Sequence, residues 1–191
     1  NGIKTDLEKE HMILTGKVHL VNIRVVPEKI KQKKYGYGAA IGYFCALDWE
    51  IYKKDPSTFP MFRHLVDHSC HARNTFTYDL KKIVELAAES PDVKVIKPAA
   101  FVFHESRCGS TLVANALTAM DTKEHRVYSE AKPLVMAVLA CGFAGKDCPM
   151  HRATELVQDV VFVMGLTDKP KEKEMFFKVQ SIGTRYMDVV L

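Results

Sequence analysis

The stretch of this chain whose residue types could do the most chemistry runs from Ser106 to Leu112 and reads Ser-Arg-Cys-Gly-Ser-Thr-Leu. It combines the permanently charged guanidinium of Arg107 with hydroxyl side chains and a glycine. A guanidinium presents a planar fork of N–H donors that suits phosphate or sulfate. Gly109 has no Cβ, so an anion can approach the backbone closely there. These residues predict a binding site for a phosphate-like or sulfate-like anion.

The hydrophobic pattern places a strand before this loop and a helix after it. Phe101 to Phe103 has the aromatic and β-branched content of a buried strand. From Thr111 onward, apolar residues recur at helical spacing. The first N–H groups of a helix have no intrahelical acceptor, and the helix dipole favours negative charge at that end. The order strand, loop, helix therefore predicts that the loop donors face a bound anion.

The loop differs from the triphosphate-binding pattern G-x-x-x-x-G-K-[ST]. With Gly109 as the second glycine, His104 stands at the first glycine position and Ser110 at the lysine position, so Thr111 alone fits. We therefore expect an anion with less charge than a triphosphate and no required metal. A nucleotide-phosphate enzyme of the kinase type remains a third hypothesis, against which the missing lysine argues.

Ser106 to Leu112 resembles the 5′-phosphosulfate loop of the P-loop sulfotransferases. Val127 to Glu130 and Phe176 to Ser181 look like the second and third strands of that family with their trailing polar residues. The resemblance covers roughly residues 98 to 191. It implies 3′-phosphoadenylyl sulfate (PAPS) as the co-substrate, no metal, and a hydroxyl or amine acceptor on a small molecule or carbohydrate.

The resemblance also assigns roles to residues. Arg107 would clamp the anion, and Glu130 would be the catalytic base that takes the proton of the acceptor. The cofactor-binding residues would be Ser106, Arg107, Cys108, Gly109, Ser110, Thr111 and Leu112.

Two features depart from the family pattern. Ala131 replaces a proline that often follows Ser-Glu, and the arginine and serine that hold the 3′-phosphate in the family lie on and after the next strand. The sequence stops at Leu191, before that strand, so we expect a sulfotransferase-like domain that is incomplete at its C-terminus. The alternative is a non-catalytic scaffold or binding subunit that keeps a degenerate domain of this type.

For the other polar residues near the loop, the sequence predicts supporting or structural roles. Lys132 and Lys178 could add to the positive field, although a strand lysine such as Lys178 is expected to be solvated rather than catalytic. His104 is expected to be a partly buried histidine with its hydrogen bonds satisfied. His64 and His68 would share a helical face near Cys70 and His71, but the H-E-x-x-H carboxylate is missing, so no metal site is expected.

Five cysteines with no C-x-x-C spacing do not indicate a zinc site. Cys141 and Cys148 could form a disulfide in an oxidising compartment, or both could be free thiols. Cys108 beside Arg107 at a helix start is expected to be a reactive thiol.

Composition and length fit a globular α/β chain with two parts. Of the 191 residues 47% are hydrophobic, and the net charge of +4 suits an anionic substrate but is too small to indicate nucleic acid. Residues 1–97 are expected to form a mostly helical extension with an extended arm, a surface on which a protein partner could bind. Residues 98–191 are expected to form a P-loop-like parallel sheet flanked by helices.

The elements expected along the chain include a strand over Val18 to Val26 and helices over Trp49 to Lys54 and Thr77 to Ser90. The uncharged stretch Tyr35 to Leu47 is shorter than the about 20 residues that a transmembrane helix needs. Because the chain begins at Asn1, we expect a processed N-terminus, which leaves the Golgi lumen, another organelle and the cytoplasm open. The carboxyl ends of the parallel strands should gather three polar groups at one crevice, namely Ser106–Thr111, Ser129–Glu130 and Gln180–Ser181.

Overall fold

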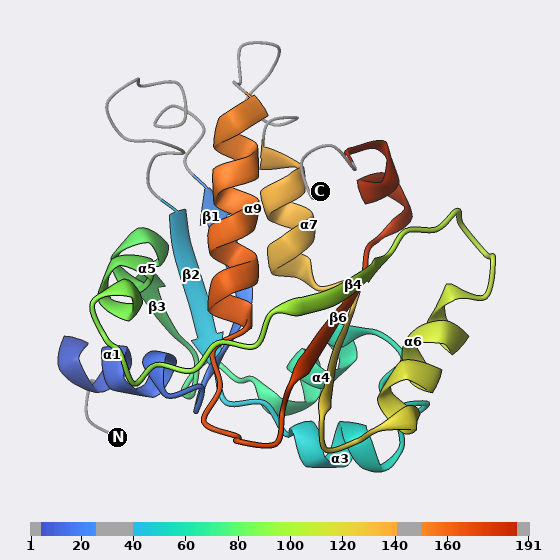
Figure 1. Ribbon diagram of the computed structural model, residues 1–191, viewed down its shortest axis with the longest axis horizontal. Coiled ribbons are helices and arrows are strands. Elements are labelled where there is room, and N and C mark those ends of the chain that lie inside the picture. Colours follow the sequence, from blue (N-terminus) through green and yellow to red (C-terminus); the bar gives the residue numbers. More distant parts are fainter. Residues whose placement is uncertain (1–4, 26–39, 141–149, 187–191) are drawn as a thin grey trace.

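Two three-stranded sheets, one antiparallel and one parallel, share a hydrophobic core in the computed structural model, which describes residues 5–25, 40–140 and 150–186 (Figure 1). In chain order the elements are α1 (Asp6–Leu14), β1 (His19–Val25), β2 (Ala40–Cys45), α3 (Trp49–Lys54), α4 (Phe62–Ser69), β3 (Phe76–Asp79), α5 (Leu80–Ala88), β4 (Pro98–Val102), α6 (Ser110–Met120), β5 (His125–Ser129), α7 (Lys132–Val138), α9 (Met150–Met164), β6 (Glu174–Lys178) and the 3-10 helix η1 (Ser181–Tyr186). The described chain is therefore α/β with one antiparallel and one parallel sheet, which confirms the predicted class at that level.

The antiparallel sheet has the strand order β1-β2-β3 and lies in the N-terminal half of the chain. The strand predicted over Val18 to Val26 is present as β1. The helix predicted from Thr77 begins only at Leu80, because Thr77 to Asp79 pairs with β2 as part of β3. Asp79 then caps α5 by accepting a hydrogen bond from the backbone N–H of Lys82 at 3.0 Å.

The parallel sheet has the order β4-β6-β5, so the last strand in the sequence lies between the other two. Helix α6 connects β4 to β5 and packs against β5 and β6. This arrangement brings the carboxyl ends of all three strands to the same end of the sheet, as the sequence predicted. It also makes β6 the central strand.

The strand before the loop is less buried than its composition predicted. Pro98, Ala99 and Ala100 of β4 are exposed, and Phe101 and Val102 are half-buried. The physical reason is the position of β4 at the edge of the described sheet, where it pairs with β6 on one side. Its aromatic side chain still contributes to packing, since Phe101 stacks on Phe177 with ring centroids 5.3 Å apart.

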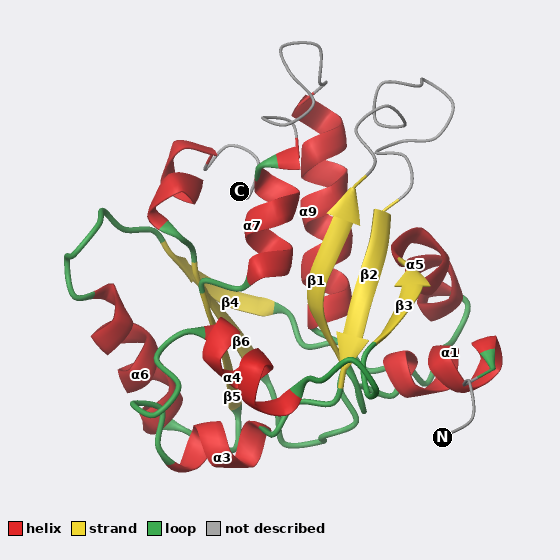
Figure 2. Ribbon diagram, turned by 180° about the vertical axis from the view of Figure 1, so that it is seen from behind, coloured by secondary structure: helices red, strands yellow, loops and turns green. Residues whose placement is uncertain are grey.

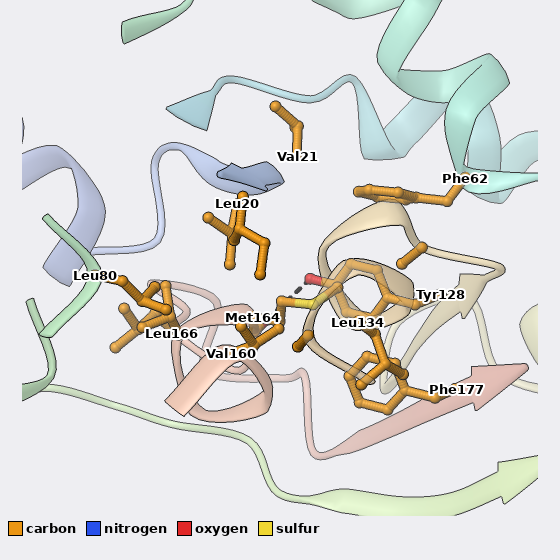
Figure 3. Packing of buried hydrophobic residues seen from close by; sticks show 14 of the residues in the cluster. Leu20, Val21, Phe62, Leu80, Tyr128, Leu134, Val160, Met164, Leu166 and Phe177 are labelled. Atoms are coloured by element: carbon orange, nitrogen blue, oxygen red, sulfur yellow. Dashed lines mark hydrogen bonds between the residues drawn. The ribbon is translucent and has the colours of Figure 1, made fainter. Parts of the chain in front are cut away.

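One core joins the two sheets, as the side chains in Figure 3 show. Leu20 of β1 and Tyr128 of β5 lie in the same cluster, with residues of α9 between them. The hydroxyl of Tyr128 donates to the carbonyl of Met164 at 2.9 Å, and burial raises the pKa of Tyr128 to about 12. Residues 5–25 and 40–97 were expected to be mostly helical, but they hold three strands besides their helices, and they pack on the C-terminal half through α7 and α9.

A buried ion network stabilises the amino end of the parallel sheet. Arg126 of β5 pairs with Glu172 and donates to the carbonyls of Met164 at 3.1 Å and Leu166 at 2.9 Å. The ammonium of Lys53 from α3 lies 3.0 Å from the same carboxylate. Burial acts to raise the pKa of Glu172, but Arg126 and Lys53 outweigh it and the pKa is lowered.

A disulfide joins Cys45 at the end of β2 to Cys70 after α4, with a Cα–Cα distance of 5.9 Å. This pair was not predicted from the sequence, because nothing in the spacing of the two residues marks them as neighbours. Cys141 and Cys148, for which a disulfide or two free thiols were expected, lie outside the described residues. Among the described cysteines, Cys108 is free and exposed.

Candidate functional site: a loop, a buried lysine and a carboxylate

The loop between β4 and α6 is exposed and turns the chain through two left-handed residues. Arg107 has φ 62° and Gly109 has φ 81°. Gly109 is the N-cap of α6 and supplies no side-chain cap to the first helical N–H groups. A Cβ on Gly109 would meet no heavy atom within 4 Å, so glycine is required here by its backbone angle. The start of α6 therefore keeps backbone donors that a ligand could use.

Arg107 carries an exposed guanidinium at this loop. Within the described part of the chain no carboxylate forms an ion pair with it. A left-handed conformation is uncommon for a residue with a Cβ and costs free energy. The backbone of Arg107 thus has an unusual conformation, and in the described residues its guanidinium has no carboxylate partner.

The burial of Lys178, at the end of β6, differs most from what the sequence predicted. The prediction that it would be solvated is wrong, because its side chain is 2% exposed. Its ammonium lies 3.3 Å from Oγ1 of Thr111 in the first turn of α6 and pairs with the carboxylate of Glu130. The cause of its burial is the central position of β6, which is paired on both sides. One buried cation thus contacts both the loop helix and the predicted base.

Glu130 directly follows β5 and has a left-handed backbone with φ 55°. Its N–H donates to the carbonyl of Lys178 at 2.8 Å, so the backbone of β6 holds this turn. The carboxyl side chain is 20% exposed, which keeps it within reach of solvent or a substrate. The preceding residue, Ser129, donates its hydroxyl to the carbonyl of Pro60 at 3.0 Å and has a structural role.

His104 lies beside Glu130 with a side chain that is 7% exposed. Its Nδ1 is 2.8 Å from the carbonyl oxygen of Glu105, which satisfies that nitrogen as predicted. Its Nε2 is buried with no hydrogen-bond partner in the described structure, and it lies 3.7 Å from Oε1 of Glu130. The expectation of a satisfied histidine therefore holds for one ring nitrogen only.

Lys178 places a positive charge at the start of α6. A cation at a helix N-terminus is unfavourable, because the helix dipole is positive there. The Lys178 ammonium nevertheless lies at the N-terminus of α6, and in the described residues Glu130 is its one ion-pair partner. Arg107 and Glu105 both lie in the adjoining loop, so the cations Arg107 and Lys178 are matched in number by the carboxylates Glu105 and Glu130.

Two hollows adjoin the cluster. One of about 170 Å³ is lined by Glu130, Lys132, Gln180 and residues of α4 and α7, and the other, of about 520 Å³, is lined by His104, Glu105, Ser106 and η1. The three polar groups lie at the carboxyl end of the parallel sheet, but they line two separate hollows and not the one crevice that the sequence predicted. The burial of Lys178 had one visible signal, which is its place within the apolar run Met175–Val179.

A scan of protein-family models, a search of curated proteins and a search of solved structures each found no match to this chain. In residues 5–25, 40–140 and 150–186, no three His, Cys, Asp or Glu side chains gather as a metal site would require. Cys70 is bonded to Cys45 and so has no thiolate to offer beside His64 and His68. Over the same residues, no helix combines the length and apolar character needed to cross a membrane.

Proposed function

We propose that this chain is a P-loop-like sulfotransferase that transfers a sulfuryl group from PAPS to a hydroxyl or amine. The observation that carries the proposal is the buried ammonium of Lys178, which contacts Thr111 of the loop helix and Glu130 together. Sulfuryl transfer needs these two functions side by side, since one group neutralises the leaving phosphate and another takes the acceptor proton.

The loop supplies the anion site in this proposal. The guanidinium of Arg107 and the backbone N–H groups at the start of α6 would hold the 5′-phosphosulfate, with Ser110 and Thr111 as hydroxyl donors. Ser106 and Cys108 would contribute through their backbone, whereas the N–H of Leu112 already donates to the carbonyl of Gly109 at 2.9 Å and does not fit its predicted role. Lys178 would add positive charge through its contact with Thr111 at the start of α6. No metal takes part.

In the transfer step, the acceptor oxygen or nitrogen forms a bond to sulfur as the bond between sulfur and the bridging phosphate oxygen breaks. Glu130 takes the proton of the acceptor, and the bridging oxygen leaves with 3′-phosphoadenosine 5′-phosphate (PAP). The ammonium of Lys178 stabilises the charge that develops on this oxygen. Its ion pair with Glu130 also fixes the carboxylate next to the loop.

Calorimetric titration of the full chain with PAP tests the proposal. We expect saturable binding that weakens at least about tenfold, or about 1.4 kcal/mol, in Arg107→Ala. Arg73→Ala is the matched control, because Arg73 is exposed and outside the loop, and its affinity should equal that of the unaltered chain. An unaltered chain that binds no PAP would contradict the proposal and favour the non-catalytic scaffold. Equal weakening in both variants would also contradict the loop assignment.

A further inference from the structure

A third hollow, of about 460 Å³, lies between the edge strand β1 and helix α7. These two elements pack against each other although they come from opposite halves of the chain (Figure 2). The apolar part of its wall comes from Ile23, Val25, Met136 and Ala140. Its volume and apolar lining are in the range that small-molecule sites have.

The hollow and the candidate site share Lys132, at the start of α7. Lys132 and Met136 are four residues apart in α7, which places them on the same helical face over about 6 Å, and Ala140 lies two residues beyond the end of that helix. Lys132 also lines the small hollow that contains Glu130 and Gln180. A molecule that fills the space between β1 and α7 therefore ends close to the proposed base.

The polar groups of the hollow indicate the charge of its ligand. Arg24 and Lys132 are exposed, and in the described residues neither has a carboxylate within ion-pair distance. The Oδ1 atom of Asn22 is buried and has no hydrogen-bond partner in the described structure. A buried polar atom without a partner costs free energy, which a ligand donor would recover. Two unpaired cations over apolar walls suit a molecule with an apolar body and an acidic group.

We propose that the hollow between β1 and α7 binds the acceptor, and that this acceptor is an amphipathic molecule with an apolar body, an acidic group and a hydroxyl or amine. The acceptor role rests on the proposed sulfotransferase function. Arg24 selects for the acidic group, because it belongs to this hollow and not to the hollow of Glu130. Met136 and Ile23 contact the apolar body, and the nucleophilic group reaches Glu130 past Lys132.

Binding is tested without any transfer reaction by fluorescence titration with 8-anilinonaphthalene-1-sulfonate, a probe with apolar rings and one anionic group. We expect saturable 1:1 binding that weakens at least fivefold in Arg24→Gln and in Met136→Glu. Lys171→Gln alters an exposed lysine of a different hollow and should leave the affinity unchanged. No binding, or affinities within twofold of the unaltered chain in both pocket variants, would overturn the pocket.

The acceptor role is tested with PAPS and two probes, 12-hydroxydodecanoic acid and its primary amide. Arg24→Gln should raise KM for the acid at least fivefold, leave kcat unchanged and leave KM for the amide unchanged. Normal PAP binding with equal KM changes for the two probes would overturn the acceptor pocket alone. Failure of the unaltered chain to bind PAP would overturn the proposed function, and with it the acceptor role.

Discussion

At the scale of single residues, the site depends on Lys178. A lysine that is 2% exposed is unusual, since a buried ammonium must have partners that replace water. Here the partners are the Glu130 carboxylate and the Thr111 hydroxyl, one on each side of the proposed transfer. Lys178 thus connects the anion loop with the proposed base, and neither the loop sequence nor the sequence around Glu130 predicts this contact.

Glu130→Gln separates the proposed base from the anion site. The amide keeps the shape of the side chain but cannot accept a proton, so transfer should fall by about 10² to 10⁴, the usual contribution of a general base. PAP affinity should stay within a few-fold of the unaltered chain, because the loop is intact. Sulfate transfer from labelled PAPS and calorimetry measure the two effects.

Glu89→Gln is the matched control for that substitution, since Glu89 is an exposed carboxylate at the end of α5. Its transfer rate should equal that of the unaltered chain. If Glu130→Gln kept full activity, the base assignment would be wrong.

The candidate site could be predicted only in part from its residues. The loop Ser106–Leu112 and Glu130 were identifiable because hydroxyls, glycine and charge follow expected strands. Lys178 and His104 were not, because their roles depend on burial and on atoms that are far apart in the sequence. Propensity arguments treat a lysine in a strand as solvated, but the sheet order made β6 central.

At the scale of elements, the loop and its helix depend on glycine for backbone geometry. Gly16 and Gly109 both have positive φ, at 67° and 81°. A Cβ on Gly16 would lie 2.5 Å from the Cα of Thr167, whereas a Cβ on Gly109 meets nothing within 4 Å. A side chain at Gly109 would therefore cost backbone strain alone, whereas a side chain at Gly16 would cost backbone strain and a steric clash.

Alanine substitutions at the two glycines measure this difference. Gly109→Ala should lower the free energy of unfolding by about 1–2 kcal/mol, the cost of the left-handed conformation. Gly16→Ala should lower the free energy of unfolding by about 1–3 kcal/mol more than Gly109→Ala does, because backbone atoms must also move to admit the methyl group. Urea denaturation followed by circular dichroism gives both values. Equal losses would show that the close contact at Gly16 relaxes freely.

The hydrophobic periodicity predicted the positions of helices and strands better than it predicted their strand pairing and their burial. Trp49 to Lys54 forms the helix expected of it, and β5 and β6 appear near their expected positions. Thr77 to Asp79 was assigned to a helix because its residues precede a strong amphipathic pattern, and pairing with β2 decided otherwise. The exposure of β4 could not be predicted, since strand composition does not reveal whether a strand has one neighbour or two.

At the scale of the whole molecule, the two sheets and the disulfide bring distant segments together. The hollow between β1 and α7 exists because α7 and α9 pack on the antiparallel sheet. No local sequence pattern predicts such packing, so the proposed acceptor site could not be predicted from the sequence. The bond between Cys45 and Cys70 joins the end of β2 to the residue that follows α4.

Removing that disulfide should destabilise the whole fold. The bond closes a segment of 25 residues, so the double variant Cys45→Ala, Cys70→Ala should lose about 3 kcal/mol of unfolding free energy. Cys108→Ser, at an exposed free thiol, is the control and should unfold like the unaltered chain. Urea denaturation under oxidising conditions measures the loss. Unchanged stability of the double variant would contradict a stabilising role of the bond.

The central claim is that the loop before α6, together with Lys178, holds a phosphate–sulfate anion. Titration of the isotope-labelled full chain with PAP, followed by amide NMR shifts, tests it most directly. Our account predicts saturable shifts concentrated at Arg107 to Leu112 and at Lys178, with the loop shifts lost in Arg107→Ala. Saturable shifts confined to other parts of the chain, or no shifts at all, would contradict it.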